Sequence, residues 1–206
     1  MIVPADPDGI YQAAEQVRNG GVIAYPTETV YGLGADPFHI DALKRIFAIK
    51  GRSTQKALIV LIPGIENLHS LTTETSPNAR RLMAAFWPGP LTLIFKAHPN
   101  LPSELLGGRS TIALRHSSAP ITQDLLFQLK GPITSTSANR SGNPPAESAF
   151  MAAEQLGRDL DLILDGGRAA DTKPSTVVDV SSNHISILRE GSITAELVWE
   201  IVDENL

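Results

Sequence analysis

The stretch Ala57-Leu58-Ile59-Val60-Leu61-Ile62 is a run of six apolar residues. A short continuous apolar run is typical of a strand that is buried on both faces, as in a sheet covered by helices. Helical patterns flank this run, over residues 41–49 on one side and residues 76–86, which begin near Pro77, on the other. The stretch therefore predicts a strand inside a layered α/β fold rather than an all-β one.

Further elements extend outward from this strand in both directions. Helices are predicted over residues 8–19, 41–49, 76–86, 120–129, 146–157 and 193–204, and strands over residues 21–26, 57–62, 91–96, 111–115, 132–134, 162–165, 176–180 and 185–188. Several of these strands are joined by turns rather than by helices. We therefore expect a mixed sheet, not a purely parallel one.

The composition is that of an ordinary globular protein, with 42% hydrophobic and 19% charged residues. A length of 206 residues fits one domain with its own core, so we expect a single domain over residues 1–206. Residues 1–8 lack the basic and apolar regions of a signal peptide, and no apolar run approaches the length of a membrane span. We therefore expect a soluble cytoplasmic protein without a membrane partner.

Several classes of function are excluded or disfavoured by composition. The chain has no cysteine, which excludes a disulfide framework, a thiolate nucleophile and a Cys-ligated zinc site. No spacing of His, Asp and Glu resembles a built-in metal site. The net charge of −5 argues against a dedicated nucleic-acid binder, because that affinity comes mainly from Lys and Arg, although a local basic patch is compatible with it.

A cationic pair follows the predicted helix at residues 41–49. Lys50 and Arg52 are separated by Gly51, and both side chains can point into one cavity if the backbone is extended. A compact ammonium beside a forked guanidinium suits a polyphosphate. The alternative is a solvated helix end, where cations interact favourably with the helix dipole.

A polar cluster follows the predicted strand at residues 132–134. Ser135, Ser137 and Asn139 alternate, so an extended backbone would place their side chains on one face. Hydroxyl and amide groups there could bind phosphate oxygens, a ribose or a base edge, and the alternative is a polar turn. A serine nucleophile is disfavoured, because the chain has no G-x-S-x-G elbow and its histidines show no motif relation to the cluster.

Other polar groups stand next to predicted strands. The threonines of Thr27-Glu28-Thr29 offer hydroxyl groups ahead of Gly32 and Gly34, where glycine permits close backbone approach; the alternative is a plain turn. Arg115 ends an apolar strand and is a candidate carboxylate clamp, with an ion pair to an acidic residue as the alternative. Ser175 precedes one strand and Arg189 ends another, which extends the polar lining.

Together these stretches resemble the YrdC family of threonylcarbamoyl-AMP synthases, also called TsaC-type proteins. The resemblance runs in one order through residues 20–34, 50–52, 87–92, 113–115, 135–142, 174–179 and 188–191. Several motifs in a fixed order are far more specific than any one of them. The resemblance implies a YrdC-like α/β fold, an open twisted mixed sheet with flanking helices around a deep concave cavity, in the short form without an additional C-terminal domain.

The resemblance also implies a reaction. L-threonine, bicarbonate and ATP would form threonylcarbamoyl-AMP and pyrophosphate, which is nucleotidyltransferase chemistry, with Mg²⁺ carried by ATP and no built-in metal. The product would pass to a tRNA threonylcarbamoyl transferase complex for the threonylcarbamoyladenosine modification of tRNA, with a weak RNA contact. The alternative is a YrdC-like paralogue without synthase activity that binds nucleotide or double-stranded RNA.

Residue roles follow from the same resemblance. The residues implied in catalysis are Lys50, Arg52, Ser137 and Asn139. The residues implied in ATP binding are these four with Thr54, Thr111, Ser135 and Arg189, and those implied in threonine binding are Thr29, Arg115 and Ser175. The chain departs from the family pattern at Ser53 and Ala57, where many members have proline, and at Leu61, where some have histidine.

Overall fold

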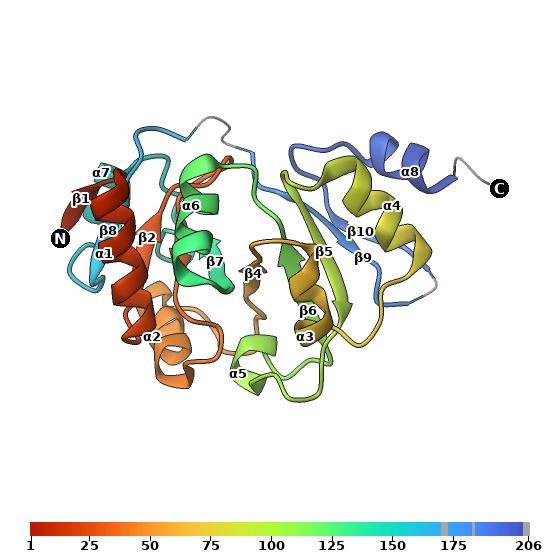
Figure 1. Cartoon of the computed structure of the whole chain (residues 1–206), viewed down its shortest axis with the longest axis horizontal. Coiled ribbons are helices and arrows are strands. Elements are labelled where there is room, and N and C mark those ends of the chain that lie inside the picture. Colours follow the sequence, from red (N-terminus) through yellow and green to blue (C-terminus); the bar gives the residue numbers. More distant parts are fainter. Residues whose placement is uncertain (170–172, 183, 204–206) are drawn as a thin grey trace.

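The structure is a computed structural model that describes residues 1–169, 173–182 and 184–203 (Figure 1). Its strands are β1 (Ile2–Pro4), β2 (Ile23–Tyr25), β3 (Gly32–Gly34), β4 (Ile59–Leu61), β5 (Leu91–Lys96), β6 (Thr111–Arg115), β7 (Ile133–Ser137), β8 (Leu162–Asp165), β9 (Thr176–Asp179) and β10 (Ser186–Arg189). Within the described residues they form a ten-stranded sheet in the order β1-β8-β2-β3-β7-β4-β6-β5-β9-β10.

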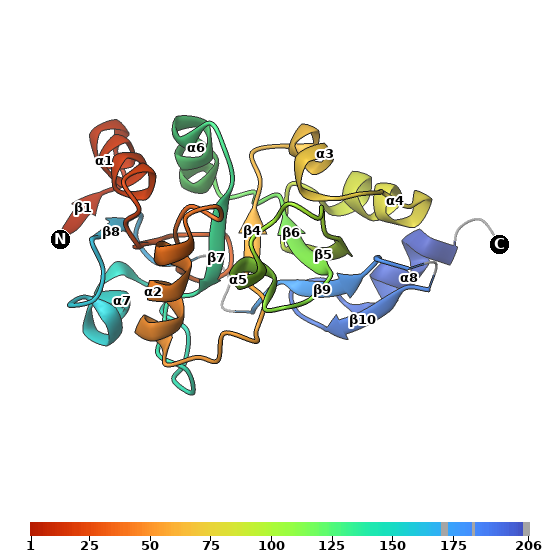
Figure 2. The same cartoon turned by 90° about the horizontal axis from the view of Figure 1, so that it is seen from below.

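Helices cover this sheet on both sides. They are α1 (Pro7–Arg18), α2 (Ile40–Lys50), α3 (Leu68–Leu71), α4 (Pro77–Phe86), α5 (Ser103–Leu106), α6 (Pro120–Leu129), α7 (Ala149–Leu156) and α8 (Ala195–Asp203), with a 3-10 turn, η1, at Ile65–Asn67. Figure 2 shows α1, α6, α3 and α4 along one side of the sheet, and α2 and α7 on the other. None of the helices in the described ranges combines the length and apolarity needed to cross a bilayer.

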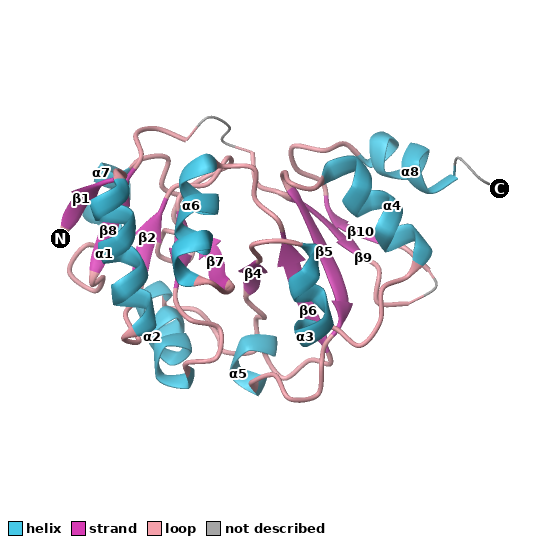
Figure 3. Ribbon diagram, viewed as in Figure 1, coloured by secondary structure: helices cyan, strands magenta, loops and turns pink. Residues whose placement is uncertain are grey.

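Strand pairing places β7, β4 and β6, which are distant from one another in the chain, side by side at the centre of the sheet (Figure 3). β7 runs antiparallel to both β3 and β4, and pairs Ser137 with Gly32 and Ser135 with Ile59. β4 also runs parallel to β6, where Leu61 is the partner of Arg115. β4 therefore has one antiparallel and one parallel neighbour, and the expected mixed α/β sheet is confirmed.

The apolar run at residues 57–62 is buried on both faces, as its sequence predicts. Val60 and Ile62 belong to a core cluster that includes side chains of α2 and α4. Leu61, between them, belongs to a second cluster with side chains of α1 and α6, against which Ile59 packs. Because side chains alternate along a strand, one short run supplies both sides of the core.

The sequence patterns did not predict β1, β3, α3, α5 or η1. β3 is Gly-Leu-Gly, a composition with little strand propensity. It forms because the backbone must pass close to its neighbours: a Cβ at Gly34 would lie 2.6 Å from the Tyr25 ring and 2.9 Å from the Thr134 carbonyl oxygen. The predicted helix over residues 193–204 is shorter, at Ala195–Asp203, and residue 204 lies outside the described residues.

Candidate functional site

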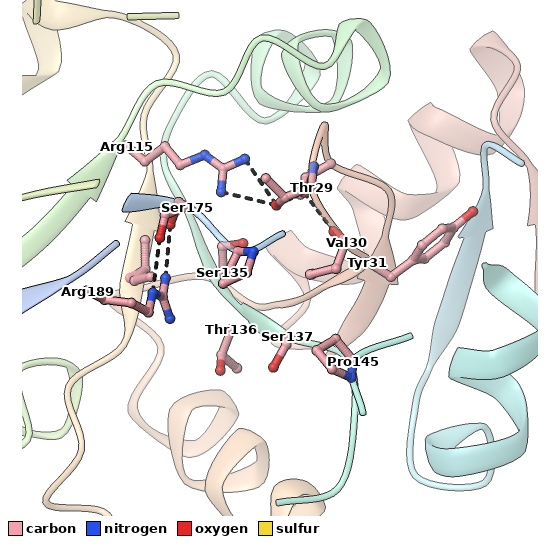
Figure 4. Close-up of a pocket in the computed structure, with 14 residues that line it drawn as sticks. Thr29, Val30, Tyr31, Arg115, Ser135, Thr136, Ser137, Pro145, Ser175 and Arg189 are labelled. Carbon is pink, nitrogen blue, oxygen red and sulfur yellow. Dashed lines mark hydrogen bonds between the residues drawn. The ribbon is translucent and has the colours of Figure 1, made fainter. Parts of the chain in front are cut away.

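A cavity of about 290 Å³ opens where β3 and β7 meet the ends of β6, β9 and β10. Its lining residues carry mainly hydroxyl, guanidinium and small apolar groups: Thr27, Thr29, Val30, Tyr31, Gly32, Ile59, Arg115, Ser135, Thr136, Ser137, Pro145, Pro174, Ser175 and Arg189. Figure 4 shows Arg115 and Arg189 on one side, with Tyr31 and Pro145 on the other. None of these described lining residues has a carboxylate, so the wall is suited to anions.

The structure brings six of the predicted site residues to this cavity: Thr29, Arg115, Ser135, Ser137, Ser175 and Arg189. The other five, Lys50, Arg52, Thr54, Thr111 and Asn139, are described but do not line it. Thr54 lies at a separate depression beside α5, and Thr111 pairs with Lys96 at the end of β6 remote from Arg115.

Lys50 supports the cavity wall from behind. Its side chain is buried, and the ammonium donates to the Ser137 carbonyl oxygen, to the Asn139 carbonyl oxygen at 3.0 Å and to Asn139 Oδ1 at 3.2 Å. All three N–H groups are thereby used inside the protein. Lys50 ends α2 and Gly51 adopts a left-handed conformation, so the backbone is not extended here. The condition on which the shared orientation of Lys50 and Arg52 depended is therefore absent, and neither residue lines this cavity.

Arg52 reaches the wall by a different contact. Nη1 donates to Thr136 Oγ1 at 3.0 Å and Nη2 donates to the Ala57 carbonyl oxygen at 3.0 Å. The buried Nε has no hydrogen-bond partner within the part of the chain that the structure describes. Burial, followed by the charge of Arg52, lowers the pKa of Lys50 to about 8. Thr136 lines the cavity, so Arg52 is one side chain removed from it.

The turn after β7 is held by its own amide network. Ser137 Oγ donates to Asn139 Oδ1 at 2.5 Å, and Asn139 Nδ2 donates to the carbonyl oxygens of Arg140 at 3.0 Å and Asn143 at 2.7 Å. Both the oxygen and the nitrogen of the Asn139 side-chain amide therefore form hydrogen bonds. Its role in the structure is to fix the turn that directly follows Ser137, the last residue of β7.

Arg115 presents its guanidinium to the cavity from the end of β6. The residue is 5% exposed and forms an ion pair with Glu28 at 2.6 Å. Nη1 and Nη2 each lie 3.4 Å from Thr29 Oγ1. Burial would raise the pKa of Glu28, but the charge of Arg115 and a hydrogen bond from Ser117 hold that pKa below its ordinary value. The sequence offered a carboxylate clamp and an ion pair as alternatives for Arg115. In the structure the candidate clamp is itself part of an ion pair.

Arg189 supplies a second cation from the last strand of the sheet. Its Nε donates to the Ser175 carbonyl oxygen at 3.0 Å, and Nη2 donates to Ser175 Oγ at 3.1 Å. Ser175 Oγ also lies 2.8 Å from Thr92 Oγ1. Burial and the charge of Arg115 lower the pKa of Arg189. The two arginines therefore repel each other across the cavity, and an anion between them would relieve that repulsion.

The geometry can be compared with known proteins. A family model described as Sua5_yciO_yrdC, Telomere recombination, matches residues 15–191. The chain belongs to the Sua5/YciO/YrdC family. The match covers all the lining residues of the cavity, and the resemblance read from the sequence motifs is confirmed.

Curated relatives in the Sua5/YciO/YrdC family include three named threonylcarbamoyl-AMP synthase. The protein from Pyrococcus abyssi is 38% identical over 192 residues, covering 93% of this chain and 56% of the relative. The protein from Bacillus subtilis is 39% identical over 198 residues, covering 96% and 57%. The protein from Coxiella burnetii is 37% identical over 176 residues, covering 85% and 95%. The chain thus spans little more than half of the first two relatives.

Solved structures place the fold in the same family. P. abyssi Sua5 complexed with L-threonine superposes with a TM-score of 0.95 at 36% identity, covering 99% of this chain and 61% of that one. Escherichia coli YciO superposes with a TM-score of 0.84 at 32% identity, covering 95% of this chain and 97% of that one. The YrdC-like fold predicted from sequence is confirmed.

Some residues at the cavity of this Sua5/YciO/YrdC chain received no role from sequence. Thr27 Oγ1 donates to the Val30 carbonyl oxygen at 2.6 Å and accepts from Thr29 N at 3.2 Å, and the spacing of the two threonines was the available signal. Tyr31 donates to the Gly167 carbonyl oxygen at 2.6 Å. Tyr31, Thr136 and Pro174 lie within the motif stretches at residues 20–34, 135–142 and 174–179 but received no role of their own, and Pro145 lies outside those stretches.

Proposed function

We propose that this chain is an L-threonylcarbamoyladenylate synthase, a nucleotidyltransferase that forms threonylcarbamoyl-AMP and pyrophosphate from L-threonine, bicarbonate and ATP. The observation that supports this most is the pair of arginines, Arg115 and Arg189, on one hydroxyl-lined cavity. That arrangement suits two anionic substrates side by side. It occurs on a fold that superposes with a Sua5 solved with L-threonine.

The proposed roles follow from position. Arg115 and Thr29 would hold the threonine carboxylate, with Ser175 beside them. Ser135, Ser137 and Arg189 would face the nucleotide. Arg52, Lys50 and Asn139 would act on the nucleotide side through Thr136 and Ser137, which they contact.

The chemistry needs positioning more than a covalent nucleophile. The threonine amine would attack the bicarbonate carbon, and loss of water would leave a carbamate. A carbamate oxygen would then attack the α-phosphorus of ATP, with pyrophosphate as the leaving group. Both steps join anions, so bringing them together and offsetting their charge would supply the rate enhancement.

Magnesium would arrive with ATP and be held mainly by phosphate oxygens and water. The described part of the chain contains no group of three or more His, Cys, Asp or Glu side chains that could hold a metal ion. The lining of hydroxyls and guanidinium groups fits the phosphates and not the metal itself. The product would pass in the cytoplasm to a tRNA threonylcarbamoyl transferase complex.

Direct detection of the product tests the proposal. Purified protein is incubated with ATP, Mg²⁺, bicarbonate and L-threonine, and threonylcarbamoyl-AMP is measured by mass spectrometry together with pyrophosphate. Omission of threonine or of bicarbonate should abolish both signals. A folded protein that binds nucleotide or double-stranded RNA without forming the product would instead be a paralogue without synthase activity.

A pH dependence follows from Lys50. Its pKa of about 8 means that the ammonium loses a proton as the pH rises through that value. The neutral amine has two N–H groups for three acceptors, so the turn carrying Ser137 should loosen and nucleotide binding should weaken above pH 8. The Kd of a non-hydrolysable ATP analogue, measured by calorimetry across this range without threonine, checks the expectation. The step should vanish in Lys50→Met, and its persistence there would assign it to another group.

A further inference from the structure

Glu28 holds Arg115 in one orientation without lining the cavity itself. Glu28 Oε1 accepts from Arg115 Nε at 3.2 Å and from Nη2 at 2.6 Å, so one edge of the guanidinium lies against the carboxylate. The side chains of Arg115 and Glu28 are 6% and 15% exposed. A planar guanidinium held along one edge has little freedom to rotate.

The carboxylate of Glu28 is itself anchored by the segment that follows β6. Ser117 is buried and its Oγ donates to Glu28 Oε2, while the Ser118 backbone N–H donates to Oε1 at 3.3 Å. Ser117 Oγ in turn accepts from Ala119 N at 3.3 Å. The anchor comes from the same segment as Arg115, so β6 and its following turn fix both ends of the pair.

The adjoining Nη1–Nη2 edge of the guanidinium faces Thr29 at the cavity. Nη1 and Nη2 both lie 3.4 Å from Thr29 Oγ1, and Thr29 Oγ1 lies 3.1 Å from Thr27 Oγ1. Thr27 donates its own hydroxyl proton to Val30, so Thr29 donates to Thr27 and accepts from Arg115. With five N–H groups in the guanidinium, one Nη1 hydrogen has no partner among the described residues. That hydrogen and the Thr29 edge meet at the cavity.

We propose that Glu28, anchored by Ser117, is a positioning residue that fixes the plane of the Arg115 guanidinium, so that its unpartnered Nη1 hydrogen, beside Thr29, is presented to the carboxylate of the amino-acid substrate. This inference rests on the proposed function for the identity of that substrate, L-threonine. Glu28 is not among the residues that line the cavity. It therefore affects the reaction through Arg115.

The Glu28→Gln variant distinguishes a positioning role of Glu28 from a purely electrostatic one, because the two roles predict opposite changes in the Kd of threonine. The variant removes a negative charge near a site for an anion, so charge alone predicts tighter binding of threonine. Gln also donates through Nε2 and cannot accept from both Arg115 and Ser117, so positioning predicts weaker binding. We expect the Kd of L-threonine, measured by calorimetry, to rise about tenfold, less than when one member of a buried charge pair is truncated, because Gln keeps one acceptor for Arg115.

A second variant preserves every charge. Ser117→Ala removes the anchor at Glu28 Oε2 and leaves Glu28, Arg115 and the cavity lining in place. The Kd for L-threonine should rise about threefold, a fraction of the full effect of losing one hydrogen bond to a charged group, because the change reaches threonine only through Glu28 and Arg115. Glu15→Gln is the matched control, because Glu15 is ion-paired with Arg18 on the exposed part of α1, and its threonine Kd should equal that of the wild type. Circular dichroism and binding of an ATP analogue verify that each variant is folded.

A measurement without substrate keeps the inference separate from the proposed function. The Arg115 Nε–H signal in a ¹⁵N-resolved NMR spectrum, assigned by its loss in Arg115→Met, should exchange slowly with solvent in the wild type. Exchange should become about tenfold faster or more in Glu28→Gln and rise less in Ser117→Ala. If the wild type neither binds threonine nor forms product, the proposed function fails while this exchange still decides what Glu28 does. Unchanged exchange, or a Glu28→Gln variant that binds threonine as tightly as the wild type or more tightly, would overturn the inference.

Discussion

Arg115→Met is expected to lower kcat/KM for threonine in pyrophosphate release by about 100-fold or more, the scale of losing one side of a buried charge pair. Two effects act in the same direction. The threonine carboxylate loses the guanidinium edge that Arg115 shares with Thr29. The carboxylate of Glu28, which is 15% exposed, also loses its counter-charge and would repel a second carboxylate brought to the cavity.

The double variant Arg115→Met/Glu28→Gln separates these two effects. Removing the unpaired carboxylate should recover part of the activity that Arg115→Met loses, although Glu28→Gln alone is expected to weaken threonine binding. This reversal of sign is a non-additivity that arises when two residues act through one another. Additive losses in the double variant would contradict the shared role. The Kd of an ATP analogue should stay near the wild-type value in both variants, which confirms that the fold and the nucleotide side are intact.

Arg52→Ala is expected to lower kcat for threonine-dependent pyrophosphate release by about 100-fold, as when one preorganised charged group is removed from a site of developing negative charge. Arg52 joins Thr136 Oγ1 on the cavity wall to the Ala57 carbonyl oxygen ahead of β4. Alanine would remove the charge and release both contacts. Rapid-quench measurement of pyrophosphate release at saturating ATP and threonine reports this loss directly.

A matched control for Arg52→Ala exists on α2. Arg45 is 43% exposed at its side chain and pairs with Asp161 at 2.9 Å, remote from the lining residues. Arg45→Ala should leave turnover within about twofold of the wild type, because exposed ion pairs contribute little. Arg52→Lys should recover part of the lost activity, because lysine restores the positive charge. It cannot restore the simultaneous contacts of the forked guanidinium with Thr136 and the Ala57 carbonyl oxygen. If Arg52→Ala turned over at the wild-type rate, the proposed role of Arg52 on the nucleotide side would be wrong.

The strands around the site could be predicted where burial on both faces leaves an apolar run. β4, at Ile59–Leu61, is the clearest case, because its alternating residues enter two cores. β3 could not be predicted from composition, since two of its three residues are glycine and its formation depends on close approach to Tyr25 and β7. Local pattern thus predicts β4, which supplies both cores, and misses β3, which fits between β2 and β7.

The site shows the same limit at the level of single residues. The alternation of Ser135, Ser137 and Asn139 predicted three side chains on one face; Ser135 and Ser137 line the cavity, whereas Asn139 does not and the intervening Thr136 does. The inward donation of Lys50 could not be predicted, because its acceptors lie in a turn 87 and 89 residues away. Glu28 received no role for a similar reason, since its partner Arg115 is 87 residues distant. Chemistry-bearing residues can be found locally, but their partners are set by strand pairing.

The position of Ile59 links the packing of the two cores to the shape of the cavity. Ile59 lines the cavity and is the β-sheet partner of Ser135, while Val60 and Leu61, next along β4, are fully buried in the two cores. If repacking of either core shifted β4, Ile59 would move with it and the shape of the cavity would change. Substitutions at these interior positions would therefore affect both the stability of the fold and turnover. Stabilising substitutions are better placed outside β4.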